Sequence, residues 1–155
     1  MVMIDIGGGT IPAAGCINLD PHHGQGEWRR KIQDGIPMPD NSVVAVRASH
    51  VMEHVPSGDE RLFVMNEVYR VLISGGTFEI IVPCVGANGK LIEGWWAYAD
   101  PTHVSFWYYP ESWLYFCDGP FKPNADYGMK IWSALRDEDM ELRMGWEARV
   151  VLRKP

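Results

Sequence analysis

The sequence has few cysteines, no long hydrophobic run and no surplus of positive charge. Its three cysteines, Cys16, Cys84 and Cys117, lie far apart and form no CxxC pair. This spacing argues against a disulfide framework or a zinc knuckle and favours reduced thiols. No apolar run approaches the length of a membrane span, and the first residues lack the basic region and cleavage site of a signal peptide. We therefore expect a cytoplasmic protein without a membrane partner.

Net charge limits the partners, and length limits the number of domains. The formal net charge of -6 gives no general field for phosphate groups, so we expect no duplex nucleic acid as the main partner. A local basic groove around residues 29–31 stays open. The chain has 155 residues, 46% hydrophobic and 22% charged, which suits one compact core. We expect a single domain over residues 1–155.

Residues 36–83 contain the clearest secondary-structure pattern. A β-branched run at residues 43–46 predicts a buried strand. Residues 77–82 predict a second buried strand, which Pro83 closes. A helical pattern lies between them. Strand, helix and strand, with nearly continuous apolar strands, are typical of a parallel sheet.

The predicted helix between these strands has one apolar face. Ser57 and Glu60 fit a capping box at its start, and Gly75-Gly76 predicts its end. The apolar residues at helical spacing are Leu62, Met65, Val68, Tyr69 and Leu72.

The N-terminal residues predict two short strands with functional ends. Residues 1–6 are an apolar run that leads into three glycines at 7–9, which allow a close approach of backbone to a ligand. Residues 16–21 predict a second strand that ends in Asp20, an acid placed to bind a ribose diol. Residues 7–15 are too few for a full crossover helix, so we expect a loop or a single turn there.

The C-terminal half is less regular. Residues 84–109 predict a long loop with a functional or interface role, and residues 112–116 predict a short helix after Pro110. Residues 129–135 and 147–154 predict two strands. The expected fold class is α/β, with a Rossmann-like, mostly parallel sheet, an antiparallel C-terminal strand and a first crossover helix that is reduced or absent.

Several stretches occur in a characteristic order: IDIGGG at 4–9, NLD at 18–20, IPMPDNS at 36–42, ASHVMEHV at 48–55, YRVLISGG at 69–76, DPTH at 100–103 and YPES at 109–112. Together they resemble the class I S-adenosylmethionine (SAM)-dependent methyltransferases. The resemblance covers most of residues 3–116. Its order and spacing are far more specific than any single stretch.

The resemblance implies a cofactor site for SAM. In this family the first glycine loop holds the methionine end, an acid after the second strand binds the ribose, and residues after the fourth strand face the methyl donor. The residues implied here are Asp5, Gly7, Gly8 and Gly9 for the methionine end, Asp20 for the ribose, and Ser49 and His50 for the methyl donor. The residue that contacts adenine stays open among Ile32, Gln33 and Asp34.

The expected activity is methyl transfer from SAM to an unidentified acceptor, such as a small molecule. Methyl transfer is an in-line displacement that depends mainly on alignment of donor and acceptor. His50 or His103 would act as a base or orient the acceptor. The short first crossover motivates an alternative, a non-catalytic relative that binds the cofactor or a partner.

The histidine cluster raises the question of a divalent metal. His50, Glu53 and His54 would share a helical face, with His103 as a fourth ligand. Some metal-dependent O-methyltransferases, including small-RNA 2′-O-methyltransferases, resemble this arrangement, although His50 stands here in place of their first acid. The sequence favours the simpler interpretation that Glu53 and His54 fix the loop by hydrogen bonds, so we assign no metal ligand. A metal-dependent hydrolase is a third hypothesis.

An aromatic segment completes the notable features. It suits an acceptor pocket or lid, and equally core packing or a self-association surface that would make a homodimer. Its members are Trp95, Trp96, Tyr98, Phe106, Trp107, Tyr108, Tyr109, Trp113, Tyr115 and Phe116.

Overall fold

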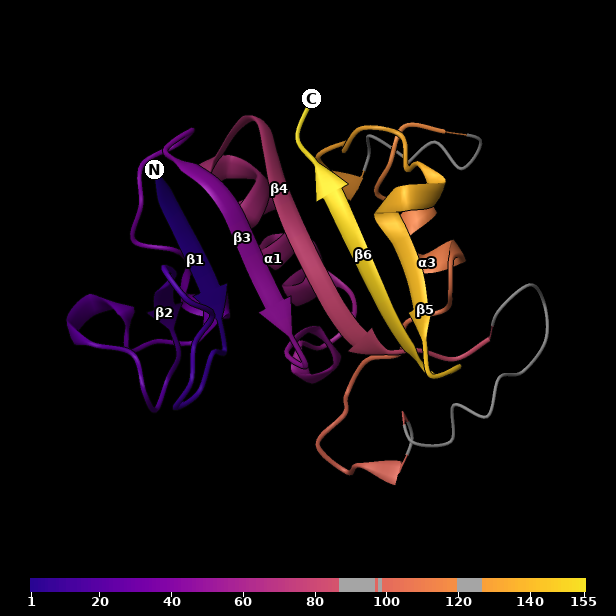
Figure 1. The fold of residues 1–155 in the computed structure, drawn as a ribbon, viewed down its shortest axis with the longest axis horizontal. Coiled ribbons are helices and arrows are strands. Elements are labelled where there is room, and N and C mark those ends of the chain that lie inside the picture. The colour runs from indigo at the N-terminus through magenta and orange to yellow at the C-terminus, as the bar shows by residue number, and fades with distance from the viewer. Residues whose placement is uncertain (87–96, 98, 120–126) are drawn as a thin grey trace.

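The computed structural model of the chain describes residues 1–86, 97, 99–119 and 127–155. Its six strands form one sheet in the order β2-β1-β3-β4-β6-β5 (Figure 1). The pairs among β1 to β4 are parallel, and β6 pairs antiparallel with both β4 and β5. The predicted α/β class, with a mostly parallel Rossmann-like sheet, is confirmed. The strands are β1 (Val2–Ile6), β2 (Ile17–Leu19), β3 (Val43–Ser49), β4 (Leu72–Pro83), β5 (Met140–Arg143) and β6 (Glu147–Arg153).

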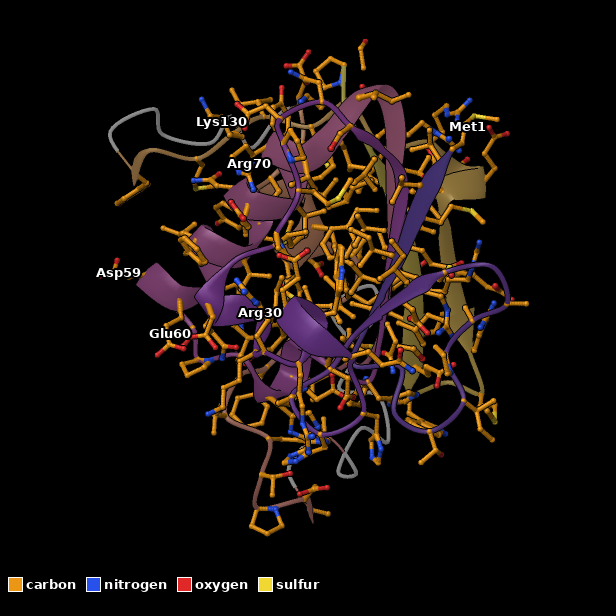
Figure 2. All side chains as sticks on the ribbon, turned by 90° about the vertical axis from the view of Figure 1, so that its left-hand side faces the viewer. Met1, Arg30, Asp59, Glu60, Arg70 and Lys130 are labelled. Carbon is orange, nitrogen blue, oxygen red and sulfur yellow. The ribbon has the colours of Figure 1, made fainter. Side chains whose placement is uncertain are left out.

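Helix α1 (Asp59–Val71) lies behind the sheet in Figure 1. Asp59 and Glu60 lie where the helix begins and Arg70 near its end (Figure 2), an arrangement that suits the helix dipole. Gly58 is the N-cap residue, and no side chain caps the helix. The predicted Ser57–Glu60 capping box is therefore wrong. The helix residues that reach the core are Val64, Met65, Val68 and Val71.

The helix ends earlier than the sequence predicts. Leu72 has extended backbone (φ −66°, ψ 141°) and pairs with Val43, so the chain passes from α1 directly into β4. Gly75 and Gly76 lie inside β4, where the register with β3 shifts, and Gly75 has φ +77°. A pairing between residues far apart in sequence sets this boundary.

The first crossover contains no helix, as predicted, and the second contains only two single turns, η1 (Gly26–Trp28) and η2 (Ile32–Asp34). No helix in the described part of the chain combines the length and apolarity needed to cross a membrane. The other short helices are η3 (Met52–His54), α3 (Glu111–Leu114) and η5 (Asp137–Asp139).

The sheet face opposite α1 carries charges across its middle strands. Asp5, Arg47 and Glu79 are register neighbours on β1, β3 and β4. Arg47 lies 3.2 Å from Asp5 and 3.4 Å from Glu79, and Arg149 on β6 lies 2.6 Å from Glu79. Parallel sheets usually have helices on both faces. On this face, Figure 1 shows no described helix over β1, β3 and β4. The alternating charges allow these strands to be exposed to water there.

The strand predicted at residues 129–135 is wrong. Trp132 makes only an isolated bridge with Cys117, and its ring packs edge-on against Tyr69 and tilted against Phe78. Packing of this buried ring and backbone hydrogen bonds of Trp132 with Phe116 and Asp118 hold the segment without a strand. The strand predicted at 147–154 is confirmed as β6, which pairs with β4 on one side and β5 on the other.

Candidate functional site

The carboxyl ends of the parallel strands bring most predicted site residues to one edge of the sheet. The three glycines at 7–9 follow β1, Asp20 follows β2, and Ser49 ends β3 directly before His50. The turn η3 continues from there. This is the edge at which α/β sheets bind ligands.

The glycine turn is bonded to β2 through all three of its amides. Gly7 N–H donates to the Leu19 carbonyl over 2.8 Å, and Gly8 N–H donates to Asn18 Oδ1 over 3.1 Å. Gly9 N–H donates to Asp20 Oδ2 over 3.1 Å. The three glycine N–H groups are therefore already hydrogen-bonded within the chain. The predicted contact of these glycines with the methionine end of SAM stays a prediction.

Glycine is required at positions 7 and 8 by space. A Cβ at Gly7, where φ is +67°, would overlap the side chain of Val51. A Cβ at Gly8 would lie 2.7 Å from Asn18 Oδ1 and 2.8 Å from Asp5 Oδ2. The missing side chains let the turn fold tightly against β2 and η3.

Both predicted acids are buried and serve the loops around them. Asp5 accepts a 2.7 Å hydrogen bond from Ala13 N–H and pairs with Arg47. Asp20 accepts hydrogen bonds from the N–H groups of His22, His23 and Gly9. Burial opposes ionisation of Asp20, but these donors outweigh it and lower its pKa. With about four lone-pair sites on a carboxylate, Asp20 has about one left for a ligand.

A cavity of about 270 Å³ lies between the glycine turn, η2 and η3. Two of the three candidates for the adenine contact, Ile32 and Gln33, line it. The third, Asp34, accepts a hydrogen bond from Lys31 N–H. The cavity has mostly apolar walls, formed by Ile6, Gly7, Leu19, Pro21, Lys31, Ile32, Gln33, Val51, His54 and Val55.

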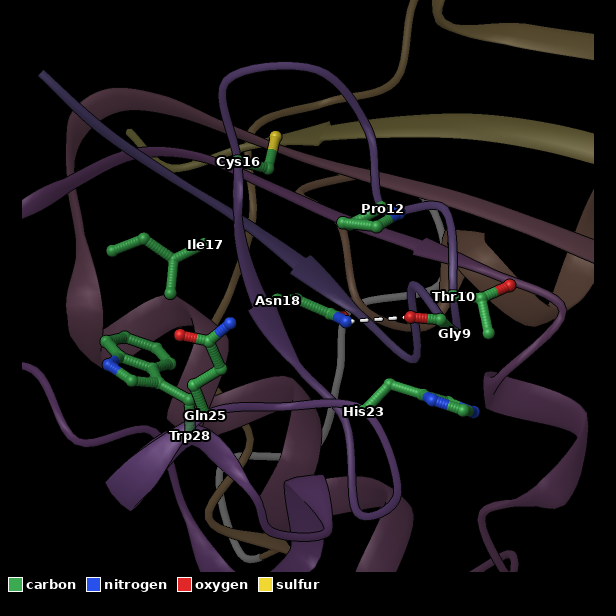
Figure 3. Close-up of a pocket in the computed structure, with 9 residues that line it drawn as sticks. All are labelled: Gly9, Thr10, Pro12, Cys16, Ile17, Asn18, His23, Gln25 and Trp28. Atoms are coloured by element: carbon green, nitrogen blue, oxygen red, sulfur yellow. Dashed lines mark hydrogen bonds between the residues drawn. The ribbon is translucent and has the colours of Figure 1, made fainter.

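A larger cavity of about 710 Å³ lies along β2 (Figure 3). Asn18 lines it and donates through Nδ2 to the Gly9 carbonyl over 2.9 Å. Leu19 lines the smaller cavity instead. Ile17 and Asn18 both line the larger cavity although consecutive strand residues point to opposite faces, so this cavity extends around the edge strand β2.

His50 lies between two carboxylates. Its backbone has φ +54°, its Nε2 lies 3.0 Å from Glu147 Oε2, and its Nδ1 lies 3.4 Å from Glu53 Oε1. Glu53 raises the pKa of His50 most, burial opposes the shift, and Glu147 adds to it. His50 therefore holds its proton more firmly than an ordinary histidine. Glu147 follows His50 by 97 residues, and no local pattern in the sequence indicates this contact.

Glu53 and His54 of η3 meet His103 from the loop after Asp100. One ligand-type atom from each lies within 4.8 Å of the other two. His54 and His103 bind loop carbonyls through Nδ1, so the prediction that His54 fixes the loop is confirmed. Glu53 fixes the loop only through its carbonyl, which accepts from Val104 and Ser105. Glu53 therefore fixes the loop by hydrogen bonds as predicted, but through its backbone, and its carboxylate oxygens accept no hydrogen bond from the described residues.

The described aromatic residues divide between core and surface. Trp107, Trp113 and Phe116 are buried, and the rings of Trp107 and Trp113 stack with centroids 5.2 Å apart. Tyr108 and Tyr115 are about half exposed. Trp95, Trp96 and Tyr98 lie outside the described residues. Core packing explains the buried rings.

Comparison with known proteins supports the predicted resemblance. A family model described as a methyltransferase domain matches residues 16–80. No curated protein sequence matches the chain.

Solved structures share the fold at low sequence identity. A SAM-dependent methyltransferase from Archaeoglobus fulgidus is 14% identical, with 98% of this chain and 85% of that chain covered and a TM-score of 0.60. One from Aquifex aeolicus is 15% identical, with 98% and 81% covered and a TM-score of 0.57. A chain from a complex with the Trm112 methyltransferase activator of Haloferax volcanii is 16% identical, with 99% and 82% covered and a TM-score of 0.58.

Proposed function

We propose that this chain, a SAM-dependent methyltransferase with the class I fold, binds the adenosyl half of SAM in the smaller cavity and methylates an acceptor that is still unidentified. The position of that cavity carries the proposal. It opens at the carboxyl ends of β1 and β2, against the glycine turn and η3. This is where α/β sheets bind nucleotides.

The walls of the smaller cavity suit an adenosyl group. Ile6, Leu19 and Val51 offer apolar surface to a purine and exclude water. The Gln33 amide offers both a donor and an acceptor to the edge of the base. Sites that enclose a drug-sized ligand span about 300–1,000 Å³. A volume of about 270 Å³ therefore fits part of the cofactor.

The other predicted cofactor residues would act by shaping the site. Gly7 permits the close contact with Val51, while Gly8, Gly9 and Asp20 tie the turn to β2. Asp5 anchors the loop that follows through Ala13. Ser49 ends β3 and sets the position of His50.

SAM supplies an activated methyl group: the S–CH₃ bond breaks as the acceptor atom bonds the methyl carbon, which yields S-adenosylhomocysteine and, from a hydroxyl acceptor, a released proton. The chain must align the two partners, which lowers such a barrier by about 7–11 kcal/mol. His103 donates through Nδ1 to Ala97, so its Nε2 carries the lone pair that a base needs. His50, with its raised pKa, suits orientation of the acceptor.

One observation favours the non-catalytic alternative. All three glycine amides and most of the Asp20 carboxylate are engaged inside the chain, which leaves few groups for the methionine end. A relative that binds the adenosyl group without transferring methyl would show this pattern.

Calorimetric titration of the metal-stripped protein with SAM tests the proposal. Val51→Phe fills the smaller cavity and should abolish saturable binding, whereas Ile17→Phe fills the larger one and should leave it unchanged. No binding by the wild-type protein, or the reverse response of the two variants, contradicts the proposed site. SAM-dependent release of S-adenosylhomocysteine with a pooled small-molecule extract separates transfer from binding alone.

We also propose a cytoplasmic location and a small-molecule acceptor. Cys16, Cys84 and Cys117 are free thiols, as expected in a reducing compartment. The net charge of -6 disfavours a polyanionic acceptor.

A further inference from the structure

The carboxylate of Glu53 is buried, and the described residues give it no hydrogen bond. The residue is 1% exposed, and neither Oε1 nor Oε2 accepts a hydrogen bond from a described residue. Burying a charged group without such bonds is costly, and native structures usually pair it with an opposite charge or a metal. His50 Nδ1 lies 3.4 Å from Glu53 Oε1, but the Nε2 of the same ring lies closer, at 3.0 Å, to Glu147 Oε2. The negative charge of Glu53 is therefore only partly balanced by the described residues.

The two histidines beside Glu53 make their hydrogen bonds through Nδ1, which leaves Nε2 without a hydrogen bond to a described residue. His54 Nδ1 lies 3.1 Å from the Thr102 carbonyl, and His103 Nδ1 lies 3.0 Å from the Ala97 carbonyl. A carbonyl oxygen only accepts hydrogen bonds, so each Nδ1 must donate. The neutral ring then carries its lone pair on Nε2. Histidines that bind metals are usually oriented by this kind of hydrogen bond.

The loop that carries His103 is bonded to the turn that carries Glu53 and His54. Val104 and Ser105 donate their N–H groups to the Glu53 carbonyl, over 2.9 and 3.1 Å. The Ser105 hydroxyl donates to the Met52 carbonyl over 2.9 Å. These bonds hold the cluster together independently of any ligand.

We propose that Glu53, His54 and His103 form a site for one divalent transition-metal ion such as Zn²⁺ or Co²⁺. One carboxylate and two imidazoles form a ligand set that such ions prefer, whereas Mg²⁺ favours oxygen ligands. Three protein ligands leave at least one position of a tetrahedral ion open to water or another molecule. Asp100 Oδ2, 3.8 Å from His103 Nε2, adds negative charge beside the site.

The geometry requires a small closure. Ligand atoms around a tetrahedral ion at about 2.1 Å lie about 3.4 Å apart. The present atoms lie within 4.8 Å, so binding draws them together by at most about 1.4 Å. His54 is exposed and has room to move. A bound ion occupies the Nε2 lone pair of His103, so metal binding and the base role proposed above exclude each other.

Metal titration without SAM tests the site independently of the proposed function. The metal-free full chain is titrated with Co²⁺, followed by its visible absorption, and the bound Co²⁺ is then displaced with Zn²⁺. We expect one Co²⁺ per chain and no comparable affinity for Mg²⁺. Mutation of residues that only hydrogen-bond a metal ligand lowers metal affinity by about 10–100-fold. Loss of a ligand itself, in Glu53→Gln or His103→Ala, should therefore weaken Co²⁺ binding by at least about 100-fold.

The double variant His22→Ala/His23→Ala is the matched control, because it removes two exposed histidines elsewhere on the chain and should bind Co²⁺ normally. Circular dichroism checks that each variant is folded. If Glu53→Gln does not fold, His103→Ala decides the result. Absence of saturable binding, or ligand variants that bind like the wild-type protein, overturns the proposal.

Discussion

The N–H of Gly9 donates to the carboxylate of Asp20 over 3.1 Å, which joins the turn after the first strand to the end of the second. The same carboxylate accepts from His22 and His23, both over 2.8 Å. The acid expected to bind ribose therefore organises the chain that surrounds the site. Its contribution to stability and its contribution to ligand binding are separable.

Changing Asp20 to Ala should destabilise the protein by about 1–3 kcal/mol, because three backbone N–H groups lose a charged acceptor. Urea unfolding measures the free energy of unfolding. The exposed Asp118→Ala is the control and should change it by less than about 0.5 kcal/mol. Equal effects of the two variants would show that the hydrogen bonds of Asp20 contribute nothing measurable.

The thiols should report which cavity the cofactor enters. Burial, with Glu147 adding to it, raises the pKa of Cys84 to about 11. Burial raises the pKa of Cys117 to about 12, with Asp139 adding to it. Cys16 is more exposed and lines the larger cavity; burial raises its pKa too, Asp5 adds to this and Arg47 opposes it. Because the thiolate reacts, iodoacetamide should label Cys16 first in the folded protein.

Saturating SAM should not slow this labelling, since Cys16 is not among the residues that line the smaller cavity. Mass spectrometry of peptides from native and urea-unfolded samples gives the rates, and unfolding should make all three thiols reactive. Protection of Cys16 by SAM would place the cofactor in the larger cavity and contradict the proposed site.

Acid should weaken the protein partly through Glu67. The carboxylate of Glu67 accepts two 2.8 Å hydrogen bonds from Arg70 and one from Ile36 N–H. Arg70 lowers the pKa of Glu67 most, burial opposes the shift, and Ile36 N–H adds to it. A carboxyl group whose pKa is lowered by folding stabilises the protein above its unfolded pKa, about 4.3 for Glu. That stability is lost as pH falls through the lower, folded pKa.

The stability difference between wild type and Glu67→Gln should therefore be largest near neutral pH and shrink below about pH 4.3. Urea unfolding at several pH values measures it. Repeating the comparison in an Arg70→Met background removes the main cause of the shift, and the pH dependence should flatten. A difference that grows towards acid would refute the assigned sign.

Local patterns predicted most of the strands and the mostly parallel sheet that they form. The β-branched runs predicted β3 and β6. The segment between β1 and β2 is short, which predicted that the first crossover contains no helix. The end of α1 was not predictable from the sequence because it depends on Leu72 pairing with Val43 in a neighbouring strand. The strand expected at 129–135 is absent because Trp132 is held by its buried ring and by one isolated bridge to Cys117, both of which depend on residues distant in sequence.

The types of residue at the candidate site were predictable from the sequence, but the groups to which they hydrogen-bond were not. Strand ends followed by glycine, acid and histidine predicted that these residues lie together at the carboxyl edge of the sheet, as they do. That Asp20 would satisfy three amides depends on how the turn after it folds back. Glu147 reaches His50 from an antiparallel strand near the C-terminus, a contact that no spacing rule predicts.

The pair Asp5 and Arg47 gives a final test of whether a predicted cofactor residue acts on the ligand or on the fold. Arg47 is the charged partner of the buried Asp5 at 3.2 Å, and Arg47→Met should cost about 1–3 kcal/mol by leaving that carboxylate with Ala13 N–H as its remaining described donor. In Asp5→Asn/Arg47→Met the unpaired charge is gone, so the double variant should be more stable than the sum of the single effects predicts. Urea unfolding of all four proteins gives this coupling energy, and calorimetry with SAM on the folded variants gives the second readout.

Because the described contacts of Asp5 are inside the chain, Asp5→Asn should change stability by more than it changes SAM affinity. Additive stability effects together with a large loss of affinity in Asp5→Asn would instead assign Asp5 to direct contact with the cofactor.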